Sequence, residues 1–516
     1  MLTRKSLSVL GLIVLLLPFS LFANKPGNKE PAHKKTSHTY ISHFENVLGT
    51  SMELKVGSAS EDDATLAENA ALSEIKRMSN ILSAYDPKSE FSRWYQTNNQ
   101  PIVVSKELFE VLSLFDQWRL KSNGALDASA EVIGKLWKQA AARQQVPTEE
   151  QLNLAVAEIK QVHWKLDPVT QTATHLSYAP VMLNSFVKTY IIRKAAEAAM
   201  NVPNIKSVVV NIGGDLVVLG NQSEIIDVKN PAADAENDLP MDRIQVGNRA
   251  IATSGNYRRG ELINGKWYSH IVDPRTGLPA DNIISATVVA PGATDAGALA
   301  TAFNVMKPAE SVQLAATIPG VDYLIITSSG ERIESKGWRK LRIPSLKTIK
   351  QADRKSKISF DKESNFELVV NLEISTQPEQ FVKRPYVAVW IEDQNHAAVR
   401  TIAVWHERDR YLPELKSWFL KYRSTYTTDK SVLSSVSSAT RSPGKYTMKW
   451  DGKDDKGNIV PPGTYTVKIE ISREHGTYQL LKKEMNFNDS PQSFTFDKNV
   501  EIASASLEYR KKTGSN

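Results

Sequence analysis

The stretch SVVVNIGGDLVVLG, residues 207–220, contains two short apolar runs, rich in valine, on either side of a pair of glycines. Such runs are typical of strands, and glycine supplies the positive φ angles that a tight turn requires. The stretch therefore predicts two short strands joined by a glycine turn. A Gly-Gly-Asp turn is usually no more than a turn, so whether it also shapes a site depends on the neighbouring segments.

Helices and further strands are predicted on both sides of this pair. Apolar residues recur at helical spacing in several segments, and two other runs are typical of strands. The predicted helices are 66–82, 106–120, 149–159, 188–200 and the buried 296–306, and the predicted strands are 285–291 and 322–331. Because the elements do not follow a regular βαβ order, the fold class predicted for residues 44–338 is α+β.

A second domain is predicted at residues 364–512. Four of its segments alternate apolar and polar residues with a period of two, which is typical of an antiparallel sandwich: 366–375, 386–393, 401–407 and 464–472. The polar stretch 450–465 predicts a Gly/Pro hairpin like those of immunoglobulin-like modules. Basic residues crowd the segment 339–363, which is interpreted as a linker; a basic patch facing an anionic membrane is the alternative.

The N-terminus predicts export. Arg4 and Lys5 precede an apolar run that ends near Ala23, so residues 1–23 are interpreted as a signal peptide and residues 24–43 as a tether. The chain has no cysteine, which suits an exported protein of a bacterial periplasm and excludes a thiol nucleophile or a cysteine-ligated metal. The net charge of +7 is spread out and does not indicate nucleic-acid binding. Association with the inner membrane stays open.

A candidate catalytic histidine lies in WYSHIVDPRTGLP, residues 267–279. The residues before His270 predict a strand, and the segment 273–277, with Asp-Pro at its start and Thr-Gly at its end, predicts a turn. A histidine at this junction is held by a rigid scaffold and faces a cleft. Taken alone, the stretch favours the other interpretation, an ordinary half-exposed strand histidine.

Several spaced motifs decide between these interpretations. They are VLGTSMEL (47–54), LSAYDPKSEFS (82–92), NGALDAS (123–129), LNSFVKTY (183–190), NIGGDL (211–216), ATSGNYRR (252–259), the histidine stretch, and ALATAFNVM (298–306). Their order and spacing resemble the FAD:protein FMN transferase family, the ApbE-like flavin transferases, over about residues 44–338. The second domain resembles an uncharacterised sandwich that accompanies this family.

The resemblance implies a T-fold-like domain that cleaves FAD, transfers FMN to a threonine hydroxyl of an acceptor flavoprotein and releases AMP, with Mg²⁺ as cofactor. It implies that His270 is the general base, since histidine titrates near neutral pH. Lys188 would counter phosphate charge. The flavin pocket that the resemblance implies comprises Leu48, Tyr85, Ala125, Leu126, Asp127, Lys188 and His270. For Asp127 the alternative role is a helix N-cap.

The resemblance also implies a metal site at Ser185 and Thr301, but the chain departs from the family there. Gly297 replaces a metal-binding Asp four residues before Thr301, Met182 replaces an Asp, and Thr189 replaces a Gly. Asp295 lies about 200° round the helix from Gly297 and cannot substitute for it. Because Mg²⁺ prefers carboxylate ligands, we expect a weak site that Gly297→Asp alone would strengthen.

Two other functions therefore remain open. The chain could be a catalytically weakened envelope protein that binds FAD or FMN. It could instead be a non-enzymatic envelope protein whose sandwich binds a partner through Trp390, Trp405 and Trp418, although these residues fit core packing better.

One segment of the second domain partly matches the small-residue motif, ending in threonine, that the family modifies. In SSVSSATRSPG, residues 434–444, three residues fit the motif, and Thr440 would carry the FMN. Ser434 and Ser438 stand where the motif has Asp and Gly. The favoured alternative is a solvated loop whose hydroxyls cap turns.

Overall fold

The computed structural model describes residues 37–512, apart from 234, 239, 257–258, 344–365, 377–383, 407–408, 429–436, 439, 442, 474–475 and 489. The expected signal peptide and most of the expected tether and linker lie outside the described residues.

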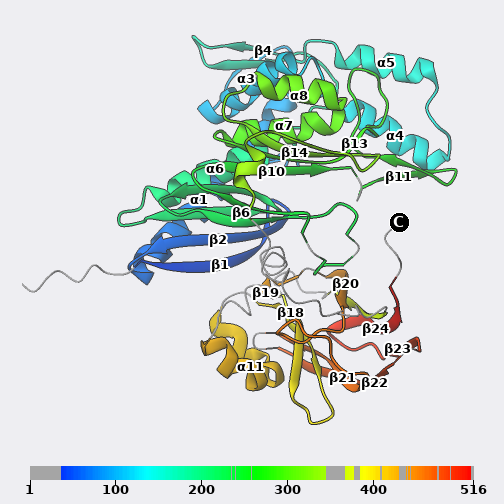
Figure 1. Ribbon diagram of the computed structural model, residues 1–516. Coiled ribbons are helices and arrows are strands. Elements are labelled where there is room, and N and C mark those ends of the chain that lie inside the picture. The colour runs from blue at the N-terminus through cyan, green and yellow to red at the C-terminus, as the bar shows by residue number, and fades with distance from the viewer. Residues whose placement is uncertain are drawn as a thin grey trace, which may run out of the picture. The chain divides into compact units, whose positions relative to one another are not determined.

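An antiparallel sheet of eight strands forms the centre of the first domain (Figure 1). In spatial order its strands are β1 (His38–Val47), β2 (Thr50–Ser58), β6 (Ser207–Ile212), β7 (Asp215–Gly220), β10 (Ala250–Gly255), β13 (Ile283–Ala290), β14 (Asp322–Thr327) and β15 (Arg332–Glu334). The strands β6 and β7 form a hairpin about Gly213 and Gly214, whose φ angles are 60° and 93°. The glycine turn that the sequence predicted is therefore confirmed.

Both faces of this sheet are buried, and the strand residues alternate between two cores. In β6, Val208 and Val210 face the main core, whereas Val209 faces a second one. Side chains of a strand point alternately to opposite faces, so a continuous apolar run fits a strand that is covered on both sides.

Helices cover the main-core face of the sheet (Figure 1). The helices of the domain are α1 (Glu61–Leu82), α2 (Glu90–Tyr95), α3 (Lys106–Lys121), α4 (Glu131–Arg143), α5 (Glu149–Ile159), α6 (Val187–Met200), α7 (Ala293–Val305), α8 (Pro308–Ala316) and α9 (Trp338–Leu341). Of these, α1, α6, α7 and α8 contact the strands of the central sheet on its main-core face. The α+β class predicted from the sequence is confirmed.

Smaller sheets complete the domain. They are β3 (Pro101–Val103), β5 (Thr172–His175) and β4 (Trp164–Asp167); β8 (Glu224–Val228) and β9 (Asp242–Val246); and the hairpin of β11 (Gly260–Ile263) and β12 (Lys266–Ser269). Residues from β8, β9 and α9 pack in the second core.

Both expected limits of this domain need correction. The tether expected to end at residue 43 overlaps β1, whose ladder with β2 begins at His38. The linker expected from residue 339 overlaps α9, where the guanidinium of Arg339 donates to Glu334 at 2.7 Å. Arg342 also pairs with Glu334, and its Nε lies 3.2 Å from Asp242. These basic side chains are bound to acidic ones within the fold, so they belong to the domain.

The second domain contains a four-stranded and a five-stranded sheet around an apolar core. The first sheet consists of β20 (Gly444–Trp450), β16 (Phe366–Ile374), β24 (Ile502–Lys511) and β23 (Gln492–Phe496). The second consists of β19 (Ser437–Ser438), β18 (Ala398–Trp405), β17 (Tyr386–Glu392), β21 (Gly463–Ser472) and β22 (Tyr478–Phe487). The expected sandwich is confirmed.

Two features of this domain were not predicted. A helix, α11 (Lys416–Thr428), follows the short 3-10 helix η2 (Asp409–Glu414) and packs on the outer side of the five-stranded sheet. The hairpin expected at 450–465 is present, with an antiparallel bridge between Lys453 and Ile459, but it connects β20 in one sheet with β21 in the other. Within the described residues, no helix combines the length and apolar character needed to span a bilayer.

Candidate functional site

Two hairpin tips meet at one end of the central sheet. Leu48 and Gly49, between β1 and β2, have φ angles of 51° and 78°. The amide of Gly213, at the tip of β6 and β7, donates to the carbonyl of Ser51 at 3.0 Å. A leucine with positive φ costs roughly 1–2 kcal/mol, and such strain is concentrated at functional sites. The strain at Leu48 is consistent with its expected place in the flavin pocket.

A lysine–aspartate pair lies beside these tips. Lys188, in the first turn of α6, places its ammonium 2.8 Å from Asp215 at the start of β7. Asp215 also accepts the amide of Thr253 at 3.2 Å. Burial raises the pKa of Asp215, although the Lys188 charge opposes that shift. The lysine side chain stays 36 % exposed, so its charge faces the surface at this end of the sheet.

The segment before α6 connects several of the expected flavin residues. The amide side chain of Asn184 donates to the Tyr85 hydroxyl at 3.0 Å, and the amide of Met182 donates to the carbonyl of Ala128 at 2.8 Å. The Tyr85 side chain is 76 % exposed. Its open face is available for stacking with a planar ligand.

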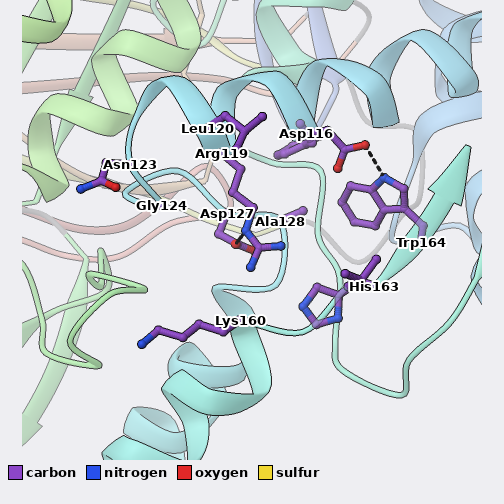
Figure 2. Close-up of a pocket in the computed structure, with 12 residues that line it drawn as sticks. Asp116, Arg119, Leu120, Asn123, Gly124, Asp127, Ala128, Lys160, His163 and Trp164 are labelled. Carbon is purple, nitrogen blue, oxygen red and sulfur yellow. Dashed lines mark hydrogen bonds and ion pairs between the residues drawn. The ribbon is translucent and has the colours of Figure 1, made fainter.

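The turn at residues 125–127 exposes fewer side chains to a possible ligand than the sequence analysis expected. Ala125 and Leu126 are buried in the main core, so their side chains do not face a ligand. Asp127 accepts hydrogen bonds from the amide and hydroxyl of Ser129, at 2.8 and 2.6 Å. It also pairs with Nε of Arg119 at 2.9 Å (Figure 2). The expectation that Asp127 accepts from a nucleotide therefore applies at most to lone pairs that these partners leave open. The capping alternative is wrong, because α4 begins at Glu131 and its N-cap residue is Ala130, so the bonds of Asp127 belong to a local turn before the helix.

A cavity of about 530 Å³ adjoins Asp127. Figure 2 shows Arg119, Lys160 and His163 around it. The sequence analysis did not identify these three residues, since they come from α3 and from the end of α5 and carry no motif. His163 is held by the hydroxyl of Ser177 at 2.7 Å, so it is a buried structural histidine.

His270 directly follows β12, at the strand end where it was predicted. Its Nδ1 lies 2.9 Å from the carbonyl of Arg259. A carbonyl only accepts, so Nδ1 carries the proton and the lone pair is on Nε2. Partial burial lowers the pKa of His270, and the charges of Arg259 and Lys138 act in the same direction, against this hydrogen bond. The exposed imidazole is therefore poised to accept a proton at Nε2 near neutral pH.

The turn after His270 is held against the rest of the domain. The amide of Gly277 donates to the carbonyl of Asp273 at 2.8 Å, and Nε1 of Trp137 donates to the Gly277 carbonyl at 2.8 Å. A Cβ on Gly124 would lie 3.6 Å from Cγ of Arg275, so this turn adjoins the turn that contains Asp127. Among the described residues, no hydrogen bond or ion pair joins His270 to Lys188.

The expected metal ligands lie together but lack a carboxylate. The Thr301 hydroxyl donates to the carbonyl of Ser185 at 3.1 Å. No group of three or more His, Cys, Asp or Glu side chains suited to a metal occurs in the described part of the chain. A Cβ on Gly297 would lie 2.4 Å from Oγ1 of Thr189. Thr189 therefore occupies the space that a side chain at residue 297 would need, which counts against the expected gain of Mg²⁺ binding by Gly297→Asp alone.

In the second domain, Trp390, Trp405 and Trp418 are at most 1 % exposed, which favours core packing over partner contacts. Thr440 is 4 % exposed, and its carbonyl accepts from Arg384 at 3.4 Å. Both interpretations of this segment, an FMN acceptor and a solvated loop, require an exposed Thr440. The structure buries this residue, so both are wrong for Thr440.

Comparison with known proteins identifies the relatives of both domains. Residues 48–325 match the model of the ApbE family, and residues 367–504 match that of a predicted periplasmic protein (DUF2271). The FAD:protein FMN transferase of Treponema pallidum is 30 % identical over 309 residues, 55 % of this chain and 84 % of the relative. The enzyme of that name from Escherichia coli K12 is 26 % identical over 325 residues, 60 % of this chain and 90 % of the relative.

Solved structures agree with this assignment. The crystal structure of the ApbE protein from Thermotoga maritima matches with a TM-score of 0.53 at 26 % identity, covering 60 % of this chain and 100 % of that one. The apo flavinyl transferase ApbE of Pseudomonas stutzeri, at 19 % identity, has the same fold with a TM-score of 0.50 over 60 % of this chain and 99 % of its own. The chain belongs to the ApbE family, with a DUF2271 domain after it.

Proposed function

We propose that this protein is an exported flavin transferase that moves FMN from FAD to a threonine hydroxyl of an acceptor flavoprotein. The observation that carries the proposal is the arrangement of His270, whose Nε2 is unprotonated and whose ring is fixed through Nδ1. Relatives named FAD:protein FMN transferase support the same activity.

In the proposed reaction, the threonine oxygen attacks the phosphorus of the FMN half of FAD. A new P–O bond forms, the P–O bond to AMP breaks, and AMP leaves with the bridging oxygen. His270 Nε2 takes the proton of the attacking hydroxyl as general base. Lys188 lies where its ammonium offsets part of the diphosphate charge, and Tyr85 and Leu48 are proposed to contact the flavin.

Ser185 and Thr301 stand at the family's metal positions, but they offer only neutral oxygens. The family's Mg²⁺ would offset phosphate charge when bound; the described residues do not fit a carboxylate-rich site for it. The proposal therefore assigns no step to the ion. The missing carboxylates favour, as the second candidate function, a weakened protein that binds FAD or FMN without transferring it.

Export to the periplasm is part of the proposal. It is supported by the signal-like N-terminus and by the match of residues 367–504 to a predicted periplasmic protein. Association with the inner membrane is a further suggestion that rests on the basic segment alone.

Incubation with FAD and an acceptor protein that contains a threonine in a small-residue motif tests the proposal. Transfer adds one FMN to the acceptor mass and releases an equal amount of AMP, both measurable by mass spectrometry and chromatography. Tight flavin binding without AMP release would support the second candidate instead, and protein indifferent to FAD would contradict both.

A further inference from the structure

A close contact joins α6 and α7 at the centre of the candidate site. Gly297 lies in the interior of α7 and is buried, and Thr189, on α6, is 2 % exposed. A glycine inside a helix is less favourable than alanine by about 1 kcal/mol, so it usually has a reason in packing. Here the reason is the neighbouring threonine: a Cβ on Gly297 would lie 2.4 Å from its Oγ1 and 3.1 Å from its Cγ2.

Thr189 cannot easily move away. Its hydroxyl donates to the carbonyl of Phe186 at 2.8 Å, one turn earlier in the chain. The side chain is β-branched, and both branches face Gly297, so rotation about χ1 replaces one close atom by the other. The backbone adds to the constraint, since Cα of Phe186 would be 3.3 Å from the added Cβ.

This contact lies where the sequence departs twice from the family. At position 297 the family has a metal-binding Asp and at position 189 a Gly, whereas this chain has Gly297 and Thr189. This chain therefore has a side chain at residue 189 and none at residue 297, the reverse of what the resemblance implies for the family. The side chain of Thr189 occupies the volume next to Cα of residue 297.

The carboxylates of Asp215 and Asp295 do not replace the one that the family's Asp supplies. Asp215 is paired with Lys188 at 2.8 Å. The carboxylate of Asp295 lies next to Gly292 at the N-terminus of α7. A Cβ on Gly292 would be 2.5 Å from Oδ2 of Asp295. Ser185 and Thr301 offer only neutral oxygens, and the Thr301 hydroxyl donates to the backbone carbonyl of Ser185.

We propose that Thr189 and Gly297 are a compensating pair that closes the divalent-cation position of the family, and that the position reopens only when both residues are exchanged. The proposal concerns the site of the proposed transfer but does not rest on that activity, because metal binding and stability are measured on the full chain without flavin.

Mn²⁺ titration followed by electron paramagnetic resonance tests the proposal on four proteins: wild type, Gly297→Asp, Thr189→Gly and the double variant. We expect the double variant alone to gain a site, with an affinity about 10–100-fold above wild type, the range by which changes at metal sites usually act. Equal affinity for Gly297→Asp and the double variant would overturn the proposal, as would wild-type protein that already binds Mn²⁺ as tightly.

Two controls separate charge from packing. Gly297→Asn combined with Thr189→Gly has the same shape as the double variant without the carboxylate, and it should bind no Mn²⁺.

Gly297→Ala should lower the Tm of the first domain by about 3–10 °C, because overpacking a core is destabilising, and Thr189→Gly should restore most of that loss. If Gly297→Ala leaves Tm unchanged or raises it, the helices have room at residue 297 and the proposed closure is refuted.

Discussion

The two nitrogens of His270 have different tasks. Nδ1 is committed to the carbonyl of Arg259, which leaves Nε2 for proton transfer. We predict that His270→Ala lowers the rate of FMN transfer by roughly 10²–10⁴-fold, the usual contribution of a general base. FAD affinity should stay within a few-fold, since the other residues of the expected flavin pocket are unchanged. Acceptor mass measures the first quantity, and fluorescence titration with FAD measures the second.

Imidazole in the buffer supplies the control for this variant, because it can accept the proton in place of the missing ring. Partial recovery of transfer by His270→Ala with imidazole, and none with a buffer of similar ionic strength, would identify proton transfer as the lost function. A variant as active as the wild type would exclude His270 as the base.

The electrostatics of His270 predict the pH dependence. Its pKa is lowered by partial burial, with Arg259 and Lys138 adding to the shift, so the unprotonated form persists below the usual titration range of histidine. Transfer should therefore be constant near pH 7 and fall only at more acidic pH. Lys138→Gln removes one positive charge, makes protonation easier and should move the acidic limb of the kcat profile to higher pH. A shift to lower pH would contradict this assignment.

For individual residues, the sequence predicted contacts between neighbours in the chain and missed contacts between residues far apart in it. The strand end and turn around His270 follow from neighbouring residues, and both are present. The bond between Arg119 and Asp127 and the contact of Thr189 with Gly297 could not be predicted, because residues on separate elements meet only in the folded chain. That is why Gly297 could be recognised as a substitution from the sequence, whereas the side chain that occupies the space beside it could not.

A buried glutamate anchors α11, the helix of the second domain. Glu470 of β21 is 0 % exposed and accepts the amides of Ser417 and Trp418, both at 2.8 Å. The first amides of a helix lack partners within it, so Glu470 acts as a cap supplied by another element. We predict that Glu470→Gln destabilises the domain by about 1–3 kcal/mol. Glutamine replaces one carboxylate oxygen by an NH₂ group, which cannot accept, so one of the two backbone amides loses its acceptor.

The exposed Glu484 of β22 provides a matched control in the same sheet. Glu484→Gln makes the same change of charge but removes no helix cap, and it should alter stability by no more than about 0.5 kcal/mol. Urea unfolding followed by tryptophan fluorescence measures both variants, since α11 contains Trp418. Equal effects of the two variants would show that charge rather than capping is responsible.

For helices and strands, the sequence predicted elements with a regular apolar pattern, but it did not predict which other elements they pack against or pair with. Helix α5 begins and ends where the apolar spacing of residues 149–159 placed it. In contrast, α11 contains few apolar residues at helical spacing and is held by Glu470, which lies far away in the sequence. The stretch 450–465 has the turn residues of a hairpin, yet its flanking strands pair with different neighbours. Strand pairing depends on the whole sheet, which a local pattern does not contain.

At the scale of the molecule, the chain has separate hydrophobic cores. The main core of the first domain contains residues between Met52 and Ile325, and the core of the sandwich contains residues between Phe366 and Tyr509. No residue is shared by these two cores. Each contains several buried aromatic side chains, so each has the means to fold as a unit.

Separate cores predict two thermal transitions in calorimetry of the full chain. FAD binds only the native first domain in the proposed function, and a ligand at 100 times its dissociation constant stabilises by about 2.7 kcal/mol. Saturating FAD should therefore raise the Tm of one transition and leave the other unchanged. Gly297→Ala should lower the Tm of the FAD-sensitive transition only, and Glu470→Gln that of the other only, because the two residues lie in different domains. A single transition that both variants shift equally would show that the two domains unfold as one cooperative unit.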